Sequence, residues 1–126
     1  MADKIQSFTD LNAWQKGHTL AINVYKLTRD FPKDELFSLT SQLRRAVVSI
    51  TSNIAEGFSR GFPKEKIQFY TIALGSLTEV QNQLLIARDI GYINKDQFQK
   101  IAEETVVVSK LINGLIKSLR IRTLNT

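Results

Sequence analysis

The sequence contains no cysteine, and this absence excludes disulfides, zinc–thiolate sites and thiol catalysis. Only two prolines and six glycines occur in 126 residues, so long stretches lack residues that interrupt a helix. No apolar run approaches the roughly 18 residues of a membrane span, and the N-terminus lacks a signal-peptide pattern. The remaining composition, with 43% hydrophobic residues, predicts one soluble, cytoplasmic globular domain over residues 1–126.

Apolar residues recur at helical spacing in four stretches, which predict helices at about 11–30, 36–59, 63–90 and 95–120. Residues 1–9 are expected to form a short tail. The residues that favour the helix boundaries are Asp10 and Asn94 as N-caps (Asn94 in a capping box with Gln97), Pro32 and Gly91 as stops, and Pro63 in a first turn. Short connections between long helices favour antiparallel neighbours, so the expected fold is all-α, an up-down-up-down four-helix bundle.

Polar residues form ordered rows on otherwise apolar faces of the second and third helices. These residues are Gln42, Arg45, Ser49, Ser52 and Glu56 on the second helix, beside an apolar line that contains Asn53, and Ser76, Glu79 and Gln83 on the third. Burying them costs free energy unless each finds a partner, so the rows are either solvated or meet polar groups of the fold or of a neighbouring subunit.

Antiparallel packing of these two helices places Glu79 level with Gln42, and Arg45 within one turn of it. We therefore predict a semi-buried Arg45–Glu79 ion pair, with Gln42 and Tyr25 nearby. The alternative is two exposed charges on separate faces.

Glu56 lies in the last turn of the second helix, where an anion is unfavourable. We expect Lys64, Lys66 or backbone N–H groups at the start of the third helix to compensate it. A structural role is favoured over a functional one.

The bundle topology gathers cations at one end. These are Arg60, Lys64, Lys66, Lys117, Arg120 and Arg122, with Lys4 nearby, whereas the opposite end mixes acids and bases. Such an end could contact phosphates, although Lys and Arg also favour helix C-termini and solvent. No aromatic–basic interleaving of the single-strand-binding type and no recognition-helix motif is identified.

Enzyme signatures are mostly absent. His18 is the only histidine, so the paired Glu-x-x-His motifs of di-metal bundles cannot form, and a hydrogen-bonded histidine packed beside Trp14 is expected. Glu56 and Glu79 are too far apart for paired acid–base catalysis, and the glycines form no phosphate loop. We predict a non-enzyme with no catalytic residue, metal or cofactor.

Three segments resemble a known family: QLRRA at 42–46, SNIAEG at 52–57 and GSLTE at 75–79. They are similar to the bacterial four-helix bundle proteins found in intervening sequences of 23S rRNA genes, also labelled S23 ribosomal proteins. The resemblance covers nearly the whole chain, and Gly17 and Phe62-Pro63 are small departures from it. It implies a four-helix bundle that assembles into a ring-like homopentamer, in a family whose cellular role is poorly defined.

Three functions are consistent with these observations. The first is a non-enzymatic oligomeric scaffold that binds structured RNA, or another nucleic acid, through its basic end. The second is a protein–protein interaction adaptor in which the charge is incidental. The third is a bundle with a small-molecule or metal site that uses His18 or Glu56.

Overall fold

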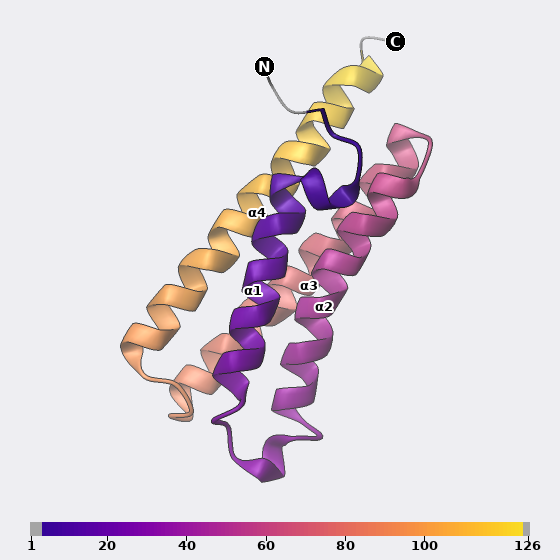
Figure 1. Cartoon of the computed structure of the whole chain (residues 1–126). Coiled ribbons are helices and arrows are strands. Elements are labelled where there is room, and N and C mark those ends of the chain that lie inside the picture. Colours follow the sequence, from indigo (N-terminus) through magenta and orange to yellow (C-terminus); the bar gives the residue numbers. More distant parts are fainter. Residues whose placement is uncertain (1–3, 125–126) are drawn as a thin grey trace.

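The computed structural model describes residues 4–124, with side chains up to residue 122, and places them in four long helices without a strand. The elements are, in order, η1 (Phe8–Asp10), α1 (Asn12–Thr28), η2 (Lys33–Glu35), α2 (Leu39–Ser59), α3 (Pro63–Asp89) and α4 (Lys95–Leu124). Each α-helix packs against its two neighbours in the cyclic order α1, α2, α3, α4, and the connections alternate between the two ends (Figure 1). The predicted all-α fold with an antiparallel up-down-up-down arrangement is confirmed.

Local sequence signals explain the boundaries around the third and fourth helices. Pro63 occupies the first turn of α3, where its missing N–H is not needed. The end of α3 is a Schellman motif, because Gly91 has a φ of 86° and the N–H of Tyr92 donates to the carbonyl of Ala87 at 2.9 Å. Asn94 and Gln97 then form the predicted capping box through bonds of 2.8 and 2.9 Å.

Two N-terminal boundaries differ from the prediction. Residues 8–10 form η1 rather than a tail, and Asp10 accepts the N–H groups of Gln6 and Ser7 instead of capping α1. The N-cap of α1 is Leu11, which makes no side-chain cap bond. The helix predicted from residue 36 begins at Leu39, because the chain first turns through η2.

The helix ends also shift slightly. The structure ends α1 at Thr28 and α3 at Asp89, one or two residues earlier than predicted. In contrast, α4 continues to Leu124, four residues beyond the predicted end, whereas residues 125 and 126 lie outside the described range. The last turn of α4 therefore extends the end at which α2 and α3 meet (Figure 1).

The core lies along the bundle axis, where all four helices contribute side chains without solvent contact, including Leu20, Leu43, Ile50, Val80 and Ile112. The contact between α2 and α3 is especially close at Gly57. A Cβ atom there would lie only 2.7 Å from Cε1 of Tyr70, which is 3% exposed. The glycine therefore permits the close approach of α2 to α3 near the basic end.

Candidate nucleic-acid interface and the polar groove

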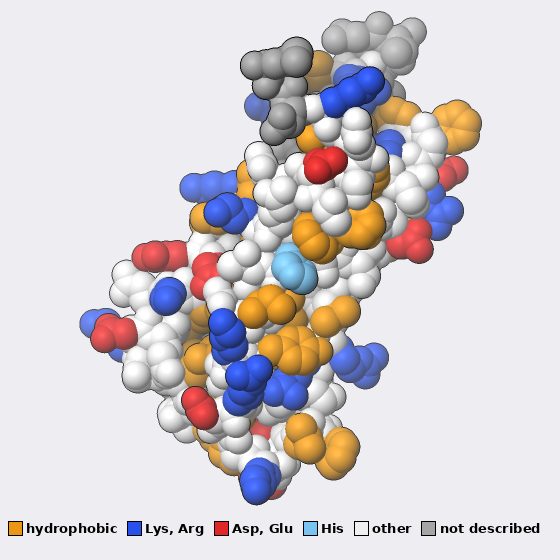
Figure 2. Space-filling model, viewed as in Figure 1, with side chains coloured by type: hydrophobic (Ala, Val, Ile, Leu, Met, Phe, Trp, Pro, Cys, Tyr) orange, Lys and Arg blue, Asp and Glu red, His pale blue; other side chains and the backbone are white. Residues whose placement is uncertain are grey.

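The end of α2, the start of α3 and the end of α4 together form the basic end that the topology predicts. Lys64, Lys117, Arg120 and Arg122 are all exposed there. Figure 2 shows Lys and Arg side chains at the end of the molecule where α4 finishes, with exposed hydrophobic side chains nearby. No described residue forms an ion pair with any of these four cations, so they are available to an external anion.

Lys66 belongs to this end but is used within the fold. Its Nζ donates to the carbonyl of Phe58 at 2.6 Å and more weakly to that of Gly57 at 3.4 Å, so it caps the C-terminus of α2. Burial lowers the pKa of Lys66, and the positive charge of Arg122 lowers that pKa further. The start of α3 and the end of α4 thus both contribute cations to this end.

The negative charge of Glu56 is balanced by a different residue from those that we expected. Its Oε2 lies 3.2 Å from Nη2 of Arg60, one turn later in the chain, and neither Lys64 nor Lys66 forms an ion pair with it. The guanidinium of Arg60 also lies 4.7 Å from the ring centre of Phe69. Because this ion pair is largely exposed, it contributes little to stability, but it partly neutralises one of the predicted phosphate-binding cations.

Part of the predicted polar row of α2 meets the polar row of α3 in one groove between these helices. Its volume is about 390 Å³, and it is lined by Gln42, Arg45, Ala46, Ser49, Ser76, Glu79 and Gln83. The hydroxyl oxygens of Ser49 and Ser76 are 2.8 Å apart and link the two helices. The amide of Asn53 donates to the carbonyl of Ser49 at 2.8 Å and to its hydroxyl at 3.1 Å, so the row is internally hydrogen-bonded.

The charges of this groove do not pair as predicted. Arg45 and Glu79 are both exposed, and the ion pairs recorded within residues 4–122 do not include them. The prediction of a semi-buried Arg45–Glu79 pair is therefore wrong. Tyr25 is also misplaced in that prediction, because its ring stacks with the guanidinium of Arg44 at 4.8 Å, on the α1 side of α2.

Gln83 is the least satisfied group of the groove. The residue is 8% exposed, and its Oε1 atom is buried without a hydrogen-bond partner among the described residues. Burying an amide oxygen without a hydrogen-bond donor costs free energy, so a molecule that donated a hydrogen bond to Oε1 of Gln83 would bind favourably at the groove.

His18 is exposed, so the prediction of a packed and hydrogen-bonded histidine is only half correct. Its ring stacks on Trp14 with centres 4.7 Å apart and planes 15° apart, but the residue stays on the surface. Residues 4–122 contain no group of three or more His, Asp or Glu side chains suited to a metal ion.

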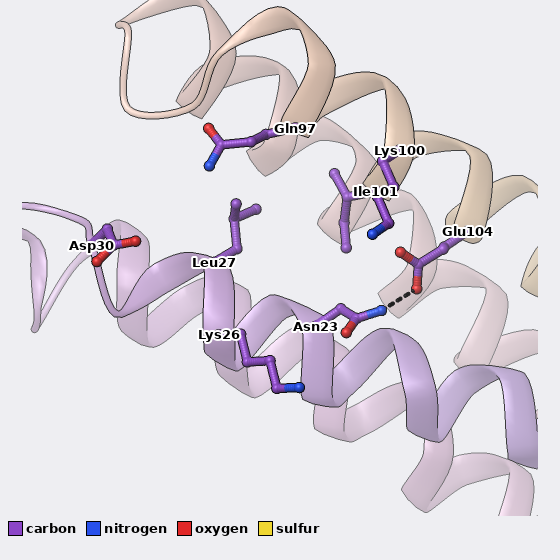
Figure 3. A pocket seen from close by; sticks show the side chains of 8 residues that line it. All are labelled: Asn23, Lys26, Leu27, Asp30, Gln97, Lys100, Ile101 and Glu104. Atoms are coloured by element: carbon purple, nitrogen blue, oxygen red, sulfur yellow. Dashed lines mark hydrogen bonds between the residues drawn. The ribbon is translucent and has the colours of Figure 1, made fainter.

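A second groove lies between α1 and α4 and was not anticipated from the sequence (Figure 3). Asn23 donates to Oε1 of Glu104 at 2.7 Å, while Leu27 and Ile101 project between the two helices. The groove has a volume of about 280 Å³.

Sequence reasoning also missed the aromatic residues of the basic end. Phe58, Phe62 and Phe69 are interspersed with the three cations of residues 60–66. The structure places Lys66 over the ring of Phe58 and Arg60 over that of Phe69, but leaves Phe62 exposed. The spacing of aromatic and basic residues across the α2–α3 connection was the available signal.

The fold and these sites define a four-helix bundle with a cationic end and a polar groove between two helices. The sequence pattern of the family described as "23S rRNA-intervening sequence protein" matches residues 9–114, so the chain belongs to this family. This confirms the resemblance drawn from the QLRRA, SNIAEG and GSLTE segments. The family description indicates no catalytic class.

A solved structure supports the fold independently. It is a protein of unknown function from the S23 ribosomal protein family of Bacteroides thetaiotaomicron, similar with a TM-score of 0.77 and 24% identity. The alignment covers 83% of this chain and 95% of that one. No curated protein matches the sequence. Among the described helices, none has both the length and the apolar content needed to cross a bilayer.

Proposed function

We propose that this protein is a non-enzymatic oligomeric scaffold that binds structured RNA through its basic end. The observation that carries the proposal is the convergence of Lys64, Lys117, Arg120 and Arg122, all exposed, at the end where three helix termini meet. The family description names the 23S rRNA intervening sequence, which makes RNA the first nucleic acid to test.

Binding at this end would depend mainly on phosphates. Flexible, exposed lysine and arginine side chains contact a backbone without reading base edges, and each neutralised phosphate releases counterions. The affinity for RNA should therefore fall steeply with salt and depend little on sequence.

The polar groove supports the oligomeric part of the proposal. Arg45 and Glu79 present unpaired opposite charges on it, and Gln83 lacks a partner there. A second copy covering the groove would supply counter-charges and a hydrogen-bond donor, and a closed ring, such as the homopentamer that the resemblance implies, would align the basic ends on one rim. We expect Arg45→Glu to reduce the mass of the assembly in native mass spectrometry, and the double variant that adds Glu79→Arg to restore it in part.

The RNA-binding proposal is tested with two triple variants of equal charge change. Lys64, Lys117 and Arg120 are replaced by glutamine in the first. The second, matched control replaces Lys33, Lys95 and Arg29, which are exposed at the opposite end of the bundle. Binding to a structured RNA hairpin is measured for each at several salt concentrations.

The first variant should bind more weakly and show a smaller salt dependence, with the slope of log affinity against log salt reduced by up to about 0.9 per lost phosphate contact. The control should behave like the original protein. Equal losses in both variants would mean that the basic end has no special role, and absence of binding at low salt would overturn the proposal.

A protein-binding adaptor is the second candidate. It is favoured by a larger and mainly apolar groove of about 750 Å³, in which Phe98, Val106 and Val107 of α4 take part. A purified oligomer that binds no RNA at low salt would make this the preferred function.

A further inference from the structure

Phe62 is unusually exposed for a large aromatic residue held by regular structure. It exposes 70% of its surface, although it is the N-cap of α3 and its carbonyl accepts the N–H of Lys66 at 3.1 Å. Pro63 follows in the first turn of the helix and restricts the backbone further. The ring is therefore presented to solvent from an ordered position rather than from a long loop.

Cations outnumber acids in the sequence around Phe62. Arg60 precedes it by two residues and Lys64 follows it by two, and both are exposed, although Arg60 pairs with Glu56 and Glu65 follows Lys64. The neighbouring rings of Phe58 and Phe69 are each covered by a cation of this end, whereas no ring or cation within residues 4–122 covers the ring of Phe62. An uncovered aromatic face next to exposed cations matches the chemistry of an unpaired nucleotide, because the ring can stack on the base while the cations contact the phosphates.

Exposure alone does not carry this argument. Phe37 is even more exposed, at 92%, but it lies at the opposite end, close in sequence to Asp34 and Glu35. Phosphates would be repelled by these carboxylates. Phe37 is thus a matched control, an exposed phenylalanine at a helix connection where acids and bases are mixed.

We propose that Phe62 is a stacking platform for an unpaired base, so that the basic end selects RNA with exposed single-stranded nucleotides over uninterrupted duplex. This rests on the proposed RNA binding and adds a substrate class to it. In a duplex the bases are stacked on each other and inaccessible to Phe62, whereas a loop or a bulge can place a base on its ring. The exposed cations can contact the phosphates of either kind of RNA.

The test compares the full-length protein with Phe62→Ala, Phe62→Trp and the control Phe37→Ala. Two RNAs of equal length are used, a hairpin with a large unpaired loop and a continuous duplex, and the loop carries the fluorescent base 2-aminopurine. The original protein should bind the hairpin more tightly than the duplex and change the fluorescence of the loop base on binding.

Phe62→Ala should weaken hairpin binding about 5- to 150-fold, the range for losing one base–aromatic stack, and leave duplex binding and its salt dependence unchanged. Phe62→Trp should keep the preference for the hairpin, and Phe37→Ala should resemble the original protein. The fluorescence change should disappear only in Phe62→Ala.

Other outcomes overturn the proposal in distinguishable ways. If Phe62→Ala retains the hairpin preference while the triple cation variant loses RNA binding, the stacking role is wrong and the phosphate-binding function stands. If Phe62→Ala instead changes the mass of the oligomer without affecting RNA preference, Phe62 is a subunit contact. If the original protein binds neither RNA, both proposals fail.

Discussion

Replacing Gly57 by alanine tests the close contact that joins α2 to α3 beneath the basic end. The added Cβ would lie 2.7 and 2.9 Å from two ring carbons of Tyr70, and 3.1 Å from Cβ of Phe69. Favourable contacts between carbon atoms are found at about 3.5–4.0 Å, so the helices or the ring would have to move by about 1 Å. Tyr70 is buried between the helices and cannot simply turn into solvent.

Two opposing effects set the magnitude. Overpacking of a core costs about 1–3 kcal/mol, and a contact with a rigid, buried ring belongs near the upper limit. Alanine in place of glycine in a helix gains up to about 1 kcal/mol. We therefore expect Gly57→Ala to lower the free energy of unfolding by about 2 kcal/mol, which corresponds to a Tm lower by roughly 8 °C for a domain of this size.

The assay is urea denaturation at fixed protein concentration, with Gly75→Ala as the matched control. Gly75 lies within α3, and nothing lies within 4 Å of the position of its added Cβ, so this variant should be more stable by about 0.5–1 kcal/mol. The difference between the variants, roughly 3 kcal/mol, isolates the steric contact. Equal stabilisation by both substitutions would show that α2 and α3 do not approach as closely as the structure describes.

Three further predictions concern the remaining contacts. Asn94→Ala removes the capping box of α4 and should cost about 1 kcal/mol in chemical denaturation, whereas Asn113→Ala inside the same helix should cost nothing. Thr105→Val removes the acceptor of the Gln81 amide, 3.1 Å away, and should destabilise by about 1 kcal/mol, an effect that Thr105→Ser should largely avoid. Burial raises the pKa of Tyr70 above its ordinary value of 10.0. The stability that the protonated Tyr70 contributes is therefore complete below pH 10 and is lost as the pH rises toward the pKa of the folded state. Tyr70→Phe should lose less stability between pH 9 and pH 11 than the original protein, as measured by chemical denaturation at each pH.

The sequence by itself determined the elements and their ends wherever the signal was local. Helical periodicity located all four helices, and the capping box at Asn94, the proline at position 63 and the stop at Gly91 act within one turn of the chain. Periodicity also placed Ser49 and Ser76 in the polar rows of their helices, because side chains three or four residues apart share a helix face. That the two hydroxyls meet is seen only in the structure. The antiparallel order of the helices was then sufficient to predict one basic end.

Only the tertiary structure decided which polar groups meet. Sequence spacing gives the height of a residue along the bundle, but the rotation of each helix about its axis decides whether a side chain faces the core, a groove or solvent. For this reason Arg45 and Glu79 share a groove without pairing, and Tyr25 contacts Arg44 instead. The same holds at the basic end, where Lys66 caps α2 and Phe62 remains exposed. Both outcomes depend on how closely the helix ends approach one another, and a local sequence pattern does not specify that distance.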